Sequence, residues 1–133
     1  MLGTFQDSHI RIEIEASADD IGRSLLYPDR LRLWMWPQQL PPGLPERFQA
    51  GLRFASTLGM VTIDHQVEVA DDNCLRWLLS GAIDGFHEWY WGDGWVQSRL
   101  EGVSLLPLKL GQTIALLRLQ EFLGDRPSTA SRN

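Results

Sequence analysis

Apolar and charged residues alternate near the start of the chain. Between His9 and Glu15, isoleucine alternates with arginine or glutamate. A period of two places all of these isoleucines on one face of an extended chain. The pattern therefore predicts a half-buried β-strand whose isoleucine face meets the core.

Two short helices are predicted after this strand. Ser17 precedes two aspartates and an apolar run that ends near Leu26, as expected for an N-cap residue followed by acidic residues in the first turn. Pro28 suits the first turn of a second helix, which would run to Trp34. Four of the seven prolines lie between Pro37 and Pro45, which indicates an extended connector rather than a helix or a central strand.

The middle of the chain has the pattern of an antiparallel meander. Short β-type segments alternate with turn residues at 59, 71–73, 84–85 and 92–94. Five further strands are expected, near Phe48–Leu58, Val61–Val69, Cys74–Ile83, Phe86–Trp91 and Trp95–Leu105.

A long closing helix with almost no polar face is predicted from Leu105 to Leu123. Its charged residues are Lys109, Arg118 and Glu121. A helix that is apolar nearly all round has to be buried on more than one side. We therefore expect the sheet to wrap around this helix and to form a container with it.

His65 lies in the apolar phase of its strand, so its side chain is expected to face the core. A three-residue turn at 71–73 would pair Val67 with Trp77. The same register would place His65 opposite Leu79. Two roles stay open for His65: a core histidine bonded to a neighbour, or a ligand contact or proton donor in a cavity.

The orientation of segment 86–91 is ambiguous, because both alternation phases are partly apolar. A two-residue turn at 93–94 would direct His87, Trp89 and Trp91 inward. A two-residue turn at 84–85 would instead direct Glu88 and Tyr90 inward.

Composition excludes several classes of protein. The chain has 133 residues, 44% hydrophobic and 22% charged, and six are tryptophan, which is typical of one globular domain over residues 1–124 with excess aromatic surface. The small polar segment 125–133 is expected to be a disordered tail. A net charge of −5 argues against nucleic acid as a partner.

The expected location is a reducing cytoplasm. Cys74 is the single cysteine, so no disulfide can form within the chain, and the first residues lack a signal-peptide pattern. No window is apolar over about 18 residues, so no transmembrane segment is expected.

The order of these elements resembles the START-like superfamily, also called SRPBCC, which includes polyketide cyclase/dehydrase-like and ubiquinone-binding-type proteins and the birch-pollen-allergen fold. The resemblance spans roughly Ile10 to Leu123. It is carried by segments 12–20 and 27–34, by Gly51 leading into a strand, and by Trp89-Tyr90-Trp91 before a turn.

This resemblance implies an α+β helix-grip fold, in which a curved antiparallel sheet wraps a long C-terminal helix, two short helices follow the first strand, and a cavity is left for an apolar ligand. The aromatic pattern usual in the superfamily favours the orientation with His87, Trp89 and Trp91 inward, which needs a bulge or longer loop near Gly85.

The function expected from this fold is binding of a small, largely apolar ligand, such as a lipid, polyketide, quinone or pigment-like molecule. Trp34 and Trp36 would gate the cavity or only pack the short helices onto the long one. No cofactor is expected, and isolated histidines without a cysteine pair give a metal site little support. The candidate contacts are Trp34, Trp36, Arg53, His65, Trp77, His87, Trp89, Trp91, Leu110, Ile114 and Leu117.

Two other functions stay open. A cyclase- or dehydratase-like enzyme would use His65 or His87 with a carboxyl group, which Glu88 could supply if it faced inward. A protein-interaction module, or a homodimer, would use tryptophans exposed on the outer face of the sheet. Arg53 and Arg99 are secondary candidates to hold a ligand carboxylate.

Overall fold

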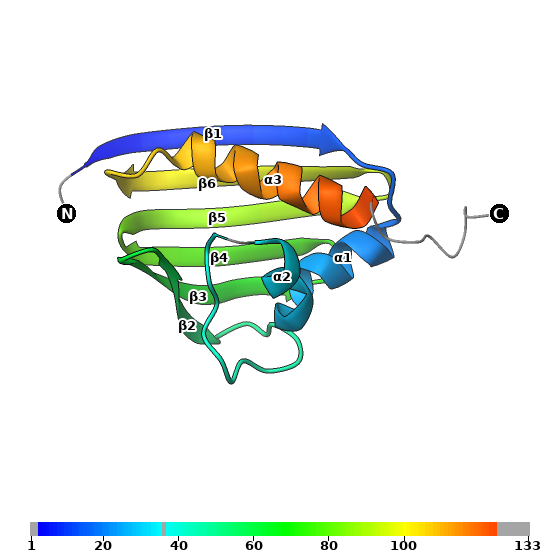
Figure 1. The fold of residues 1–133 in the computed structure, drawn as a ribbon, viewed down its shortest axis with the longest axis horizontal. Helices are drawn as coiled ribbons and strands as arrows, with labels where there is room; N and C mark the ends of the chain where they lie inside the picture. Colours follow the sequence, from blue (N-terminus) through cyan, green and yellow to red (C-terminus); the bar gives the residue numbers. More distant parts are fainter. Residues whose placement is uncertain (1–2, 36, 125–133) are drawn as a thin grey trace.

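The structure is a computed structural model that describes residues 3–35 and 37–124. Within these ranges the chain forms an α+β arrangement of a six-stranded antiparallel sheet and three helices (Figure 1). The predicted elements are present, although their ends shift by a few residues. In chain order they are β1 (Thr4–Glu13), α1 (Ala18–Leu26), α2 (Pro28–Trp34), β2 (Arg53–Leu58), β3 (Val61–Asp71), β4 (Cys74–Gly81), β5 (Ile83–Gly92), β6 (Trp95–Ser104) and α3 (Leu108–Gly124).

The sheet is open, with the strand order β1-β6-β5-β4-β3-β2. The first and last strands in sequence are therefore neighbours, and β1 and β2 form the two edges. All three helices lie on the same face of the sheet (Figure 1). Helix α3 contacts β1 and β6, whereas α1 contacts β5, so the core lies between the helices and the inner face of the strands.

The two short helices form as the sequence predicts. Ser17 is the N-cap of α1, and its hydroxyl oxygen accepts a hydrogen bond from the Asp20 backbone N–H at 3.1 Å. Pro28 lies in the first turn of α2. Trp34 is buried and its indole N–H donates to the Ser24 carbonyl at 3.0 Å, which fastens α2 to α1.

Strands β3 and β4 keep the predicted pairing although the turn between them differs. The expected three-residue turn is wrong, because Asp71 pairs with Cys74 across a turn of two residues. A bulge at Glu68 supplies the missing residue, so His65 still lies opposite Leu79.

Strand β5 directs His87, Trp89 and Trp91 inward, in the orientation that the 93–94 turn predicts. Gly92 pairs with Trp95 across this two-residue turn, and Gly94 adopts the left-handed φ of 83° that glycine tolerates. The alternative turn at 84–85 does not form, because Gly85 already pairs with Leu79 and the connection from β4 lies before it. The Glu88 phase therefore faces outward.

The expectation that α3 is buried on more than one side is wrong. Leu110, Ile114 and Leu117 are 58%, 40% and 55% exposed. The reason is that the sheet is open and lies against one side of the helix, so it does not close around α3 (Figure 1). The side that faces the sheet consists of Leu108, Gln112, Leu116, Leu119 and Leu123.

Strands β5 and β6 approach each other so closely at Gly85 and Gly102 that no side chain fits. A Cβ atom on Gly85 would lie 1.9 Å from the Glu101 carbonyl oxygen and 2.6 Å from the Gly102 Cα. We expect Gly85→Ala to lower the free energy of unfolding by about 3 kcal/mol, measured by urea denaturation, because the strands must separate.

The control for this substitution is Gly111→Ala in α3, where nothing lies within 4 Å of an added Cβ atom. That variant should be neutral or more stable, since alanine favours the helix. A loss smaller than about 0.5 kcal/mol for Gly85→Ala would contradict the close approach.

Candidate functional site

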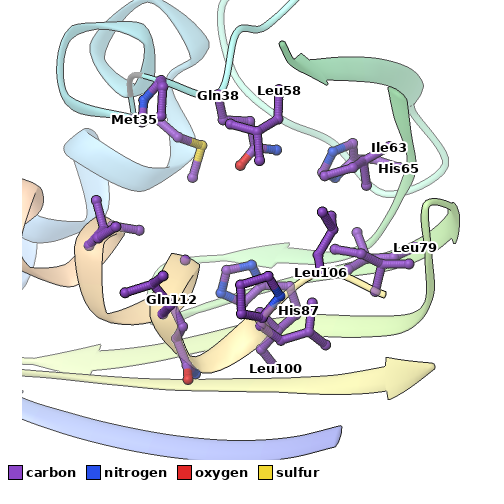
Figure 2. Close-up of a pocket in the computed structure, with 18 residues that line it drawn as sticks. Met35, Gln38, Leu58, Ile63, His65, Leu79, His87, Leu100, Leu106 and Gln112 are labelled. Atoms are coloured by element: carbon purple, nitrogen blue, oxygen red, sulfur yellow. The ribbon is translucent and has the colours of Figure 1, made fainter. Parts of the chain in front are cut away.

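A cavity of about 230 Å³ lies between the inner face of the sheet and α3. Its walls come from residues of β2 to β6, from the first half of α3 with the two residues before it, and from the segment that follows α2 (Figure 2). Most lining side chains are aliphatic, among them Leu79, Ile83 and Leu100. The polar side chains among the described lining residues are Gln38, His65, His87 and Gln112.

Four of the candidate contacts from the sequence meet at this cavity. His65 and His87 reach it from β3 and β5, and Leu110 and Ile114 reach it from α3. Leu110 and Ile114 are also partly exposed, so they lie where the cavity meets the molecular surface. Leu117, further along α3, is not among the described lining residues.

The tryptophan candidates lie behind the cavity wall instead of on it. Trp34, Trp77, Trp89 and Trp91 are at most 1% exposed, and none lines the cavity. The alternative of an outer-face tryptophan surface is therefore wrong for Trp89 and Trp91, the two tryptophans of segment 86–91. Trp95 is half-buried, with the Arg11 guanidinium 4.5 Å from its ring centroid. Trp36 lies outside the described residues.

The charged candidates face away from the cavity. Arg53 is exposed at the start of β2. Glu88 binds Arg76 on the outer face of the sheet, with 2.7 Å between the carboxylate and guanidinium groups. Arg99 lies within 3.2 Å of Glu101 on the same face.

A hydrogen-bond chain holds each cavity histidine. On one side, the Gln38 amide N–H donates to the Ser56 hydroxyl oxygen at 2.6 Å, and this oxygen lies 2.8 Å from His65 Nε2. On the other side, the Gln112 amide N–H donates to the Ser98 hydroxyl oxygen at 3.0 Å, and that oxygen lies 3.1 Å from His87 Nε2.

Aromatic rings surround both imidazoles on the side away from the cavity. Phe54 stacks on His65 with 4.5 Å between ring centroids, and Trp89 lies against His87 at 3.6 Å. The edge of Trp77 contacts both histidines. This burial lowers the pKa of each histidine to about 3. The charge of His65 lowers the pKa of His87 further. Both imidazoles are therefore neutral at physiological pH.

This arrangement favours recognition over acid–base chemistry. A neutral histidine with so low a pKa is a weak base, and no carboxylate is among the described residues that line the cavity. Within the described ranges, no group of three or more histidine, cysteine, aspartate or glutamate side chains is placed to hold a metal ion.

Sequence reasoning missed four residues of the hydrogen-bond chains, and the sequence carried a signal for three of them. Gln38 lies in the connector after α2, where no periodic pattern marks it. Ser98 lies in the inward phase of β6 between two buried apolar residues, and Ser56 follows a buried phenylalanine in the inward phase of β2. Gln112 is the polar member of the buried side of α3. A polar residue in an apolar phase needs a partner, and that requirement was the available signal.

No protein-family model matches this chain, and no curated protein matches it. Solved structures do share the fold. A protein from Chromobacterium violaceum is similar with a TM-score of 0.72 at 14% identity, over 90% of this chain and 99% of that one. Norcoclaurine synthase from Thalictrum flavum, in complex with dopamine and hydroxybenzaldehyde, is similar with a TM-score of 0.64 at 15% identity, over 96% and 91%.

A protein from the dynemicin biosynthetic locus is also similar, with a TM-score of 0.64 at 16% identity. The likeness covers 90% of this chain and 47% of that protein. These identities support a shared fold and nothing finer. None of the helices in ranges 3–35 and 37–124 has both the length and the apolar character needed to cross a bilayer.

The two cavity histidines should make stability depend on pH. Each has a pKa of about 3 in the folded protein, against an ordinary value of 6.5, so the unfolded chain binds more protons between these values. The free energy of unfolding should therefore be nearly independent of these two histidines above pH 6.5 and should fall as the pH drops below 6.5. Between pH 7 and pH 5.5 we expect a loss of about 1 kcal/mol per histidine, measured by urea denaturation.

Substitutions separate the two contributions. His65→Gln and His87→Gln should each remove about half of this pH dependence, and the double variant should remove nearly all of it. A double variant that still loses the same free energy over this pH range would show that other groups cause the effect.

Proposed function

We propose that this protein is a member of the START-like superfamily with a helix-grip fold, and that it binds a small, largely apolar molecule between the sheet and α3. The observation that carries the proposal is the cavity of about 230 Å³ with mostly aliphatic walls. Protein interiors are close-packed and have few voids larger than a water molecule. A space of this size beside a filled aromatic core is therefore a candidate for a bound molecule.

The size of the cavity favours a ligand with one ring or a short chain. Sites for drug-sized ligands usually enclose roughly 300–1,000 Å³, so this cavity lies below that range. The dopamine and hydroxybenzaldehyde bound by norcoclaurine synthase are single-ring molecules, which supports the same size class here.

The lining residues support binding of a ligand without catalysis. Burial of apolar ligand surface would supply most of the affinity. The neutral imidazoles and the two glutamine amides would then set the orientation of the ligand. Because Trp77 and Trp89 lie directly behind the histidines, tryptophan fluorescence should report an occupied cavity.

The test uses α-methylstyrene, a single-ring hydrocarbon, as a probe. We expect it to change tryptophan emission and, at ten times its Kd, to stabilise the protein by about 1.4 kcal/mol. The corresponding rise in Tm is roughly 5 °C. An unchanged Tm and emission for the wild-type protein would refute the proposal.

A cavity-blocking variant and a matched control locate the binding site. Gly111 lines the cavity with open space around its Cβ position, so Gly111→Met should fill the space and abolish binding. Gly124, at the far end of α3, also has open space around its Cβ position, and Gly124→Met should bind the probe as the wild type does. Equal binding by both variants would place the probe outside this cavity.

A further inference from the structure

The contacts of Gln112 determine which way its buried amide points. Its amide nitrogen lies 3.1 Å from the Ser8 carbonyl oxygen and 3.0 Å from the Ser98 carbonyl oxygen. Carbonyl oxygens only accept hydrogen bonds, so the NH₂ group of the amide must face them. The same nitrogen lies 3.0 Å from the Ser98 hydroxyl oxygen. The two amide hydrogens serve three oxygens, so the hydroxyl oxygen shares one N–H with a carbonyl oxygen and, in this contact, can only accept.

The Ser98 hydroxyl then determines the protonation of His87. Ser98 is fully buried, so its own O–H proton needs an acceptor. Among its contacts the atom with a free lone pair is His87 Nε2, at 3.1 Å. Since Nε2 accepts this bond and the ring is neutral, the ring proton resides on Nδ1.

The N–H at Nδ1 of His87 is left for a ligand. No hydrogen bond joins this atom to any residue of the described chain, and His87 is only half-buried because part of it lines the cavity. His65 differs, since its Nδ1 is sealed in the core without a partner. Gln38, the glutamine of the chain that holds His65, makes no side-chain hydrogen bond to a backbone carbonyl among the described residues. The orientation of its amide is therefore not fixed in the way that of Gln112 is.

We propose that His87 Nδ1–H donates a hydrogen bond to the carbonyl oxygen of the ligand, so that the cavity recognises a small neutral aldehyde, ketone or ester with a single ring. This inference rests on the proposed function. A carbonyl oxygen accepts this hydrogen bond and brings no donor of its own that would need a further partner.

An ionised ligand fits the cavity less well. The described residues that line it include no lysine or arginine, so a carboxylate would lose its hydration without gaining a counter-charge. The low pKa of His87 keeps its ring uncharged, so the ring offers a neutral donor, which suits a neutral acceptor.

The experiment compares acetophenone with α-methylstyrene. The two molecules have nearly the same shape, but acetophenone carries a C=O group where α-methylstyrene carries a C=CH₂ group. Fluorescence titration gives the Kd of each probe for the wild type and for His87→Phe, which keeps a ring and removes both nitrogens. We expect the ratio of the acetophenone Kd to the α-methylstyrene Kd to be about tenfold higher in the variant, because the acetophenone carbonyl is then buried without a hydrogen-bond donor. The Kd of α-methylstyrene in each variant reports any change in the shape of the cavity, so the effect of the carbonyl group is read only from the ratio of the two Kd values.

A second variant and a spectroscopic measurement keep the inference testable if His87→Phe fails to fold. Ser98→Ala removes the hydroxyl group that donates to His87 Nε2. The ratio of the acetophenone Kd to the α-methylstyrene Kd should therefore also rise, by a smaller factor. The ¹⁵N chemical shifts of His87 should show protonation at Nδ1 in the wild type and a mixture of tautomers in Ser98→Ala. A merely structural role for Ser98 would leave the tautomer unchanged.

The outcomes separate the inference from the function on which it rests. If neither probe binds the wild type, the proposed function fails, and the inference with it. If both probes bind and their Kd ratio is the same in the wild type and the variants, the function stands and the carbonyl contact is overturned. A wild-type His87 protonated at Nε2 would also overturn it.

Discussion

The buried amide of Gln112 is the interaction on which the interior depends. It joins α3 to the backbone of β1 at Ser8 and to both the backbone and the hydroxyl of β6 at Ser98. The Gln112 side chain is 1% exposed, and its amide nitrogen makes hydrogen bonds that would be costly to leave unmade, so this nitrogen fixes where α3 lies on the sheet. The Oε1 atom of the same amide has no partner among the described residues. Through Ser98 the same amide orients His87, and thereby links the position of the helix to the chemistry of the cavity wall.

The cavity results from how α3 covers the sheet. The helix contacts β1 and β6 at one edge, while α1 and the buried tryptophans fill the region beside β5. Between these regions the inward side chains are leucine, isoleucine and two histidines, and the core of large aromatic rings stops behind them. The exposed Leu110 and Ile114 lie where this gap meets the surface. The apolar outer side of the helix is thus continuous with the apolar lining of the cavity.

The local patterns predicted most of the fold. Alternation predicted the strands, and Ser17 and Pro28 predicted the two short helices. The turns at 84–85 and 93–94 predicted opposite faces of β5, and only the aromatic pattern of the resembled superfamily favoured the face that points inward. The burial of α3 was not predictable in the same way, because an apolar helix shows how much surface could be buried and not how far the sheet reaches around it. The turn between β3 and β4 was predicted one residue too long, because the bulge at Glu68 inserts an extra residue into β3 that the alternation of residue types does not show. The histidines were found from their phase, but the serine and glutamine partners lie far away in sequence, so only the folded chain brings them together.

Whether a small molecule occupies the space between the sheet and α3 can be determined with bound α-methylstyrene. Intermolecular nuclear Overhauser effects between its ring protons and the methyl groups of the protein locate the probe. We expect contacts to Ile63, Leu79 and Leu100, whose side chains line the interior of the cavity. Contacts confined to Leu33 and Leu117, which are exposed on the helices and outside the described cavity lining, would contradict this expectation.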